Sequence, residues 1–233
     1  YTPWEWHKPL KEEAEKVGID FFSSPFDNTA VDLLEEIGVG FYKVASFELV
    51  DIPLIKYIAS KGKPIIMSTG MATLGEIEAA VNAAFECGNE QVALLRCASA
   101  YPAITDDMNL RTMQNMAEIF KVPVGLSDHS MGDVGAITAV ALGANIIEKH
   151  FCLDRSIENP DSSFSMNPQE FAEMVQHIRQ AEVAIGQVKY GAAEQEKHNL
   201  AFRRSIFCVE DIKKGEKLTE KNVRIIRPGQ GLE

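Results

Sequence analysis

Six short apolar segments alternate with longer stretches of helical periodicity over the first 186 residues, and this alternation constrains the fold more than any other feature. The stretches between the apolar segments repeat their apolar residues about every 3.6 positions, as amphipathic helices do. Strands that alternate with helices are typical of parallel βα units, so an α/β protein with six such units is predicted. The predicted strands are residues 19–24, 41–46, 64–69, 91–98, 122–127 and 145–150.

A further helix is predicted over residues 9–17, before the first strand, with Gly18 as its C-cap. A closed (β/α)₈ TIM barrel needs eight strands in about 250 residues. A barrel is therefore expected here in N-terminally truncated form, with two strands and one helix lying before residue 1. The alternative is an open six-stranded sheet. The barrel is favoured because nearly every predicted strand ends in polar residues, which an open sheet gathers at its switch point instead.

The pattern changes after residue 186. Residues 187–200 are polar and predict a linker between a synthase-like barrel domain at 1–186 and a different segment at 201–233. This last segment has short β-like runs separated by turn sequences such as DIKKGE and RPGQG, and it is too short to form a stable domain alone. The sequence is thus interpreted as a fragment of a longer enzyme.

Charge and cysteine content exclude several partner classes. The net charge of −11 argues against nucleic acid as the main partner. No apolar run approaches the roughly 18 residues that a membrane helix needs, so no membrane partner is expected. The four cysteines are widely spaced and contain no CxxC pair, which predicts neither a structural zinc site nor a disulfide framework and favours a cytoplasmic location.

Two histidines close successive predicted strands. His129 and His150 are 21 residues apart in the sequence, which places their side chains next to each other on one rim of the sheet. Two imidazoles with nearby carboxylates suit Mn²⁺ or a similar ion better than a thiolate zinc site. The simpler alternative is that each histidine only hydrogen-bonds its neighbours. The carboxylates that are candidates for this shell are Glu48, Glu148 and Asp161.

A lysine lies inside the strand sequence FYKVAS, where an ammonium is costly to bury unless an anion or a catalytic role stabilises it. Four serines at strand ends add hydroxyl donors, and such a ring with one lysine is suited to a phosphate or carboxylate. Each serine alone is equally consistent with a helix N-cap. The predicted anion site consists of Lys43, Ser46, Ser68, Ser99 and Ser127.

Ten ordered motifs extend over nearly the whole chain: TPWEWHKPL, FFSSPFD, YKVASFELVDIPLI, PIIMSTGMAT, ASAYPA, PVGLSDHS, NIIEKHF, PDSSFSM, FRRSIFCVEDIKKGE and IRPGQGL. Together they resemble the sialic acid synthase family. The resemblance implies a TIM barrel joined to an antifreeze-like (SAF) domain, working as a domain-swapped homodimer. It also implies condensation of phosphoenolpyruvate with an N-acetylated amino sugar, release of phosphate, and a divalent metal such as Mn²⁺, with Mg²⁺ or Co²⁺ as alternatives.

The resemblance further implies a role for each matching residue. His129 and His150 match metal ligands, and Glu48 and Asp161 match carboxylates that position water or sugar. Which of these two carboxylates handles the attacking water stays open, as does the acceptor sugar. A binding-only barrel without catalysis is the alternative of another class. The remaining matches are to the phosphoenolpyruvate site (Lys43, Ser46, Ser68 and Ser127, with Ser24 and Ser99), the acceptor site (Tyr101 and Glu148) and a partner-inserted arginine (Arg227).

Overall fold

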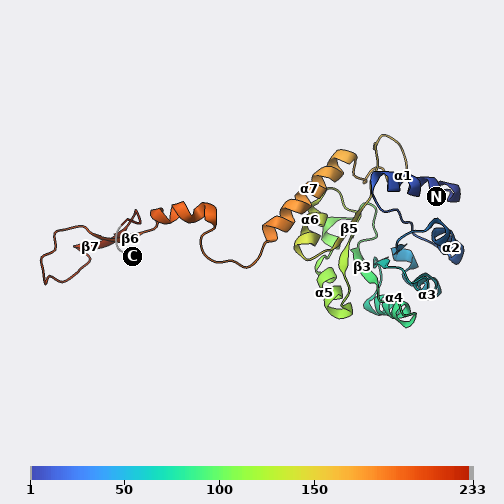
Figure 1. Ribbon diagram of the computed structural model, residues 1–233, viewed down its shortest axis with the longest axis horizontal. Coiled ribbons are helices and arrows are strands. Elements are labelled where there is room, and N and C mark those ends of the chain that lie inside the picture. The colour runs from blue at the N-terminus through green and yellow to red at the C-terminus, as the bar shows by residue number, and fades with distance from the viewer. Residues whose placement is uncertain (1, 231–233) are drawn as a thin grey trace. The chain divides into compact units, whose positions relative to one another are not determined.

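The computed structural model describes residues 2–230 and divides into two units, Tyr1–Gly186 and Gln187–Glu233 (Figure 1). The first unit is built on a five-stranded parallel sheet whose strands follow one another in chain order. An all-parallel sheet in this order is the arrangement predicted from the alternating pattern. Its strands are β1 (Tyr42–Val44), β2 (Ile65–Ser68), β3 (Val92–Cys97), β4 (Val124–Asp128) and β5 (Ile146–Lys149).

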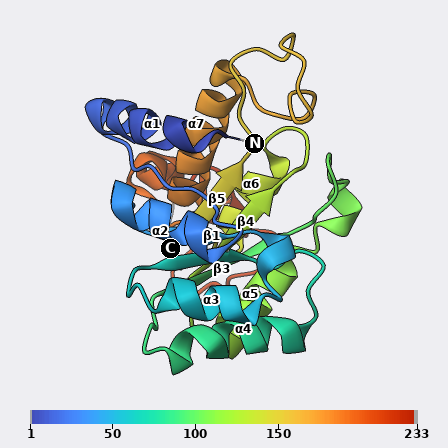
Figure 2. The same ribbon diagram turned by 90° about the vertical axis from the view of Figure 1, so that its right-hand side faces the viewer.

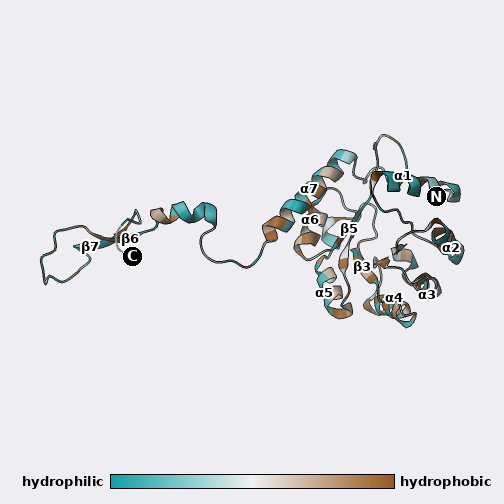
Figure 3. Ribbon diagram, in the orientation of Figure 1, coloured by the Kyte–Doolittle hydropathy of each residue, from teal (hydrophilic) through white to brown (hydrophobic). Residues whose placement is uncertain are grey.

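The helices of the first unit surround the curled sheet in an arc, which two perpendicular views make clear (Figures 1 and 2). Helix α6 is largely hydrophobic and packs between β4 and α7, whereas α1 is mainly hydrophilic (Figure 3). None of the described helices is long and apolar enough to cross a membrane. The helices are α1 (Trp4–Val17), α2 (Asn28–Ile37), α3 (Ile52–Ala59), α4 (Leu74–Glu86), α5 (Arg111–Phe120), α6 (Val134–Ala141) and α7 (Pro168–Ile185), with 3₁₀ turns η1 (Ser46–Glu48) and η2 (Thr105–Asp107).

The predicted first strand, residues 19–24, is wrong. This segment is irregular, and the sheet has five strands rather than six. Ile19 is 63% exposed, and the segment reaches β1 through a ring contact between Phe22 and Phe41, with centroids 4.4 Å apart. A strand is stabilised by ladder hydrogen bonds and side-chain packing with its neighbours. Among the described residues, the only strand that could pair with this segment is β1, which is itself only three residues long.

Local capping determines where several helices begin, and therefore where the strand-to-helix loops lie. The Asp27 carboxylate accepts a hydrogen bond from the Ala30 backbone N–H at the start of α2. Thr73 and Glu76 form a capping box at the start of α4, and Asn167 and Glu170 form another at α7. The starts of α4 and α7 follow β2 and β5, so the loops after these strands lie at the carboxyl edge of the sheet.

The hydrophobic core lies between the sheet and its helices. Tyr42, Ile58, Met67 and Leu126 are each at most 1% exposed and belong to one continuous cluster. A smaller cluster joins α6 to α7 through Ala136, Met174 and neighbouring side chains. These clusters fill the layer behind the strands, so the polar residues at the strand ends lie at the edge of a rigid scaffold.

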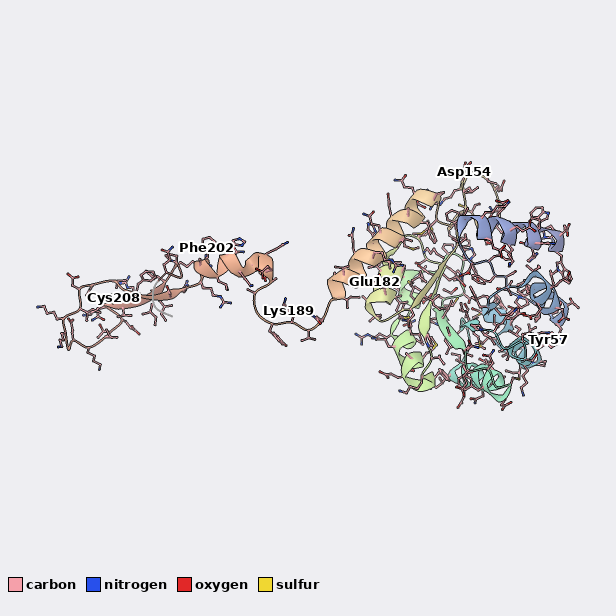
Figure 4. All side chains as sticks on the ribbon, viewed as in Figure 1. Tyr57, Asp154, Glu182, Lys189, Phe202 and Cys208 are labelled. Carbon is pink, nitrogen blue, oxygen red and sulfur yellow. The ribbon has the colours of Figure 1, made fainter. Side chains whose placement is uncertain are left out.

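The second unit contains the 3₁₀ helix η3 (Glu194–Phe202) and an antiparallel pair, β6 (Ser205–Cys208) and β7 (Val223–Ile226). Lys189 lies on the extended segment before η3 (Figure 4). The hairpin agrees with the short β-like runs expected after residue 200. The SAF assignment and the boundaries at 187–200 and 201–233 stay predictions, and residues 231–233 of that segment lie outside the described residues.

Candidate active site

A cavity of about 310 Å³ opens at the carboxyl ends of the strands. Most of its walls are polar, and each of the five strands of the first unit contributes side chains, either from the strand itself or from the loop after it. Nine of the thirteen residues predicted for the site lie in this wall. The lining consists of Phe22, Ser23, Ser24, Lys43, Ala45, Ser46, Ser68, Tyr101, Ser127, His129, Glu148 and His150.

Lys43 is the buried cation of the cavity. Its ammonium donates hydrogen bonds to the Ser68 hydroxyl at 2.7 Å and to the Val44 carbonyl at 3.0 Å. One oxygen of Glu148 lies 3.8 Å away. Burial lowers the pKa of Lys43 below its usual range, and the attraction of Glu148 offsets only part of that effect. A bound anion would supply the charge compensation that this ammonium lacks.

Strand register brings three polar side chains into one row. Cys97 pairs with Ser127, and Ser127 pairs with Glu148 on the next strand. Residues in register on neighbouring parallel strands point to the same face of the sheet. The Ser127 hydroxyl donates to the Glu148 carboxylate at 2.6 Å. The row therefore holds Glu148 in place beside Lys43.

The two histidines lie against each other, as their strand positions predicted. The ring centroids of His129 and His150 are 5.1 Å apart at an interplanar angle of 69°. Nδ1 of His129 is 3.0 Å from the Ala98 carbonyl, so this nitrogen carries the proton and Nε2 keeps its lone pair. Tyr101 stacks on His129 with centroids 4.2 Å apart and lies edge-on to His150.

The environments of the two rings move their pKa values in opposite directions. Burial lowers the pKa of His129, but contacts with Cys97 and the Ala98 carbonyl outweigh it and leave a net increase. Burial and the neighbouring His129 lower the pKa of His150, although Asp161 acts in the opposite direction. Asp161 is on the loop after β5, with Oδ2 3.7 Å from Nδ1 of His150.

Glu48 and Ser99 lie next to the cavity rather than in its wall. Oε2 of Glu48 is a buried oxygen that has no hydrogen-bond partner among residues 2–230, and burial raises the pKa of this carboxyl despite the proximity of Lys43. Ser99 contacts the Cys97 thiol at 3.5 Å. Arg227 follows β7 in the second unit, and its predicted role stays a prediction.

Sequence reasoning missed Cys97. The thiol is almost fully buried and lies 3.8 Å from Nδ1 of His129. Burial raises the pKa of Cys97, but hydrogen bonds with His129, Ser99 and Ser46 outweigh it and bring the value to about 7. Its position at the carboxyl end of β3, two residues before Ser99, is the signal that points to it.

Gly70 allows the polar groups to converge. A Cβ atom at this position would lie 2.0 Å from the Ser99 hydroxyl, 2.8 Å from the Ser46 hydroxyl and 3.2 Å from the Cys97 sulfur. The Gly70 backbone N–H donates to the Ser46 hydroxyl at 3.2 Å. A side chain at this position would force the two serine hydroxyls to move.

The histidine pair fits part of a divalent-metal site. No group of three or more His, Cys, Asp or Glu side chains among the described residues converges as a complete metal site. The pair nevertheless fits two positions of a mixed nitrogen and oxygen shell. Nδ1 of His129 bonds a carbonyl, as in metal-bound histidines, and within the described part of the chain Nε2 has no hydrogen-bond partner. Water or substrate oxygens would complete such a shell.

This arrangement defines the class of protein: a parallel α/β enzyme whose strand ends combine an anion site with an imidazole pair. The NeuB family model matches residues 1–190. A pseudaminic acid synthase from Helicobacter pylori is 45% identical over 233 residues, which cover 99% of this chain and 68% of that protein. The chain therefore belongs to the NeuB family.

Two further comparisons agree with this membership. An N,N'-diacetyllegionaminic acid synthase from Campylobacter jejuni is 42% identical, with 97% of this chain and 69% of that protein covered. The crystal structure of an N-acetylneuraminic acid synthetase from Leptospira borgpetersenii has a TM-score of 0.79 and 35% identity, and it covers 85% of this chain and 70% of that chain. The chain spans about two thirds of the length of these relatives.

Proposed function

We propose that this chain carries the barrel part of a pseudaminic acid synthase. The reaction joins phosphoenolpyruvate to 2,4-diacetamido-2,4,6-trideoxy-L-altrose and releases phosphate, forming a nine-carbon 2-keto sugar acid. The observation that carries the proposal is the meeting of the anion site around Lys43 with the pair His129 and His150 in one cavity. The identity of 45–46% with pseudaminic acid synthases from two genera supports the acceptor assignment.

The donor end of the cavity suits phosphoenolpyruvate. Lys43 is an ammonium already held by Ser68, and Ser24, Ser46 and Ser127 line the same space. A phosphate or carboxylate placed there receives one full positive charge and several hydroxyl donors, and such charge-assisted hydrogen bonds are strong. Ser99 contributes indirectly through its contact with Cys97.

His129 and His150 are the residues that would hold the divalent metal, with Mn²⁺ as our choice and Mg²⁺ or Co²⁺ as alternatives. A bound divalent metal supplies Lewis acidity toward the carbonyl oxygen of the acceptor. Tyr101 stacks on His129, is about half exposed, and lines the cavity together with Glu148. This position supports their assignment to the acceptor sugar.

The chain's own residues account for orientation and proton handling. The anion site holds the donor so that its C3 faces the acceptor aldehyde. The C2=C3 π pair of the donor forms the new carbon–carbon bond, the C=O π pair moves to the aldehyde oxygen, and that oxygen takes a proton to become a hydroxyl. Water then adds to the electron-poor C2, the bond from C2 to the phosphate oxygen breaks, and the C2 hydroxyl loses its proton as the 2-keto group forms and phosphate leaves. A carboxylate takes the proton from that water, and the candidates are Glu48 and Asp161. The raised pKa and the unpartnered buried oxygen of Glu48 suit such a base.

The larger architecture is part of the same proposal. We interpret the curled five-stranded sheet as part of a (β/α)₈ barrel and residues 201–233 as the start of an SAF domain. In a domain-swapped homodimer, Arg227 would enter the partner's active site and hold the acyl group of the sugar. The curvature of the sheet within an arc of helices supports the first interpretation, and the antiparallel pair of β6 and β7 supports the second.

A phosphate-release assay tests the function. The protein is incubated with phosphoenolpyruvate, Mn²⁺ and one of three sugars, the diacetamido altrose, N-acetylmannosamine or the legionaminic precursor, before and after EDTA. Preference for the diacetamido sugar, with loss of turnover in EDTA, is the expected result. Preference for N-acetylmannosamine would instead indicate a sialic acid synthase, and preference for the legionaminic precursor a legionaminic acid synthase. Turnover with none of the three sugars would overturn the proposal in favour of a binding-only barrel.

A further inference from the structure

Asp128 and Lys149 form the only ion pair among the described residues in which both side chains are almost completely buried. Their side chains are 0% and 1% exposed, and Lys149 Nζ lies 2.8 Å from Asp128 Oδ2. In every other ion pair of the described chain, at least one side chain is 20% exposed or more. The two residues end β4 and β5 and are partners in register.

The pair lies on the opposite side of the strands from the cavity. Ser127 and Glu148 precede the pair and line the cavity, and the two histidines that follow it do so as well. Because alternate residues of a strand point to opposite faces, Asp128 and Lys149 point toward the helix layer. A Cβ at Gly135 of α6 would lie 3.2 Å from Asp128 Oδ2, which places the carboxylate beneath that helix.

Lys149 also holds the loop that follows His129. Its ammonium donates to the Ser130 carbonyl at 2.5 Å and to the Gly132 carbonyl at 2.9 Å. The other oxygen of Asp128 accepts from the Ser130 backbone N–H at 2.8 Å and from its hydroxyl at 2.7 Å. These bonds tie the backbone on both sides of His129 to the strand that carries His150.

Stability alone is a poor reason for such a pair. The desolvation of two buried charges often outweighs their attraction, and well-packed apolar side chains are frequently as stable. The pair provides directional hydrogen bonds to the carbonyls of residues 130 and 132, which apolar side chains cannot form. That bonding restrains the loop and the relative position of two adjacent strand ends.

We propose that Asp128 and Lys149 are positioning residues that hold His129 and His150 at the separation needed to bind one metal ion. The inference rests on the proposed function, since it takes these histidines as metal ligands. Each member of the pair immediately precedes one histidine in the chain. A small rotation at either strand end would therefore move an imidazole directly, and metal affinity is sensitive to such displacements.

The test measures Mn²⁺ affinity by calorimetry on the full chain, and the visible spectrum of bound Co²⁺, without substrates. The variants are Lys149→Met, Asp128→Asn and the double variant, each with its thermal midpoint. We expect Lys149→Met to weaken Mn²⁺ binding about 10- to 100-fold, the usual effect of outer-shell changes. We expect the double variant to regain most of its thermal midpoint, because it leaves no unpaired buried charge, while its affinity stays weak and its Co²⁺ spectrum altered.

Controls separate the possible failures. Lys56→Met removes an exposed ion pair with Glu86 at 2.8 Å, and it should change neither metal affinity nor spectrum. If the double variant recovers affinity together with stability, or if Lys149→Met binds Mn²⁺ like the wild type, the positioning role is refuted. If the wild type and His129→Ala bind Mn²⁺ equally, the metal site of the proposed function fails, and this inference fails with it.

Discussion

The ammonium of Lys43 and the carboxylate of Glu148 lie 3.8 Å apart across the cavity. Each group also has a serine partner, because Lys43 donates a hydrogen bond to Ser68 and Glu148 accepts one from Ser127. The lysine is buried, whereas the glutamate side chain is 36% exposed. The lysine therefore bears most of the desolvation cost, and the glutamate can remain hydrated on one side. The cavity thus holds a cation that is incompletely compensated before any ligand binds.

Replacing Lys43 with an uncharged residue should increase stability and decrease activity. We expect Lys43→Met to raise the free energy of unfolding by about 1 kcal/mol, because a buried charge is replaced by an apolar chain of similar length. Turnover should fall by two orders of magnitude or more, because the donor anion loses its counter-charge. Urea denaturation and phosphate release measure the two effects. Lys63→Met, at the half-buried pair with Glu35 outside the cavity, is the matched control and should lose stability slightly. A destabilised Lys43→Met protein would contradict this account of the site.

Neutralising Glu148 should change how donor binding depends on pH. The carboxylate raises the pKa of Lys43, and burial lowers it. In Glu148→Gln the largest attraction is lost and only the smaller effects of Cys97 and Glu48 oppose burial, so Lys43 loses its proton at a lower pH than in the wild type. Phosphoenolpyruvate affinity, which needs the protonated lysine, should decline as pH rises in both proteins, and at lower pH in the variant. Calorimetric titrations at a series of pH values measure this, and coincident profiles would argue against the pairing.

A side chain at position 70 should lower both the stability of the protein and its affinity for the donor. In Gly70→Ala the new methyl group meets the hydroxyls of Ser99 and Ser46, so we expect a loss of about 1–3 kcal/mol in unfolding free energy and a higher KM for phosphoenolpyruvate. The double variant Gly70→Ala with Ser99→Ala removes the nearest clash and should recover part of the stability. Gly75→Ala is the control: this exposed glycine of α4 has open space around it, and the substitution should be neutral or stabilising by up to about 1 kcal/mol.

Glu35 should make the fold sensitive to acid. Burial raises its pKa, but hydrogen bonds from Lys63 and Tyr42 outweigh that effect and leave the pKa below its usual value of 4.5. A carboxyl whose pKa is lower when folded stabilises the protein above its unfolded pKa and loses this contribution as pH falls through the folded value. Stability should therefore decrease below pH 4.5, less steeply in Glu35→Gln. Chemical denaturation from pH 7 down to pH 3 measures the difference, and parallel curves would refute it.

Much of the helical layer follows from local pattern. The predicted helix at 168–185 matches α7 at both ends, because Asn167 caps its start and Gly186 follows its end. The strands at 64–69 and 122–127 are found within one or two residues as β2 and β4. The helix predicted at 9–17 begins earlier, at Trp4, because Pro9 is tolerated inside the first turns of α1. The irregular segment at 19–24 has apolar content typical of a strand, but pairing is a property of the neighbours rather than of the segment.

The candidate site was also predicted only in part from the sequence. His129, His150 and Lys43 could be identified from sequence because residues at the ends of parallel strands must meet at one edge of the sheet. Asp128, Lys149 and Cys97 also stand at strand ends, but their sequence positions alone did not show what each side chain contacts. Their roles depend on which face each residue presents and on what lies 3–4 Å away.

The sequence by itself determined the alternation of strands and helices, the helix ends and the edge of the sheet where chemistry gathers, because these depend on short-range periodicity and capping. Only the tertiary structure decided that Glu148 compensates Lys43, that Gly70 leaves room for Ser46 and Ser99, and that Asp128 pairs with Lys149. The physical reason is that each of these contacts joins residues more than 20 positions apart, and their charge and steric energies exist only once strand register has brought them together.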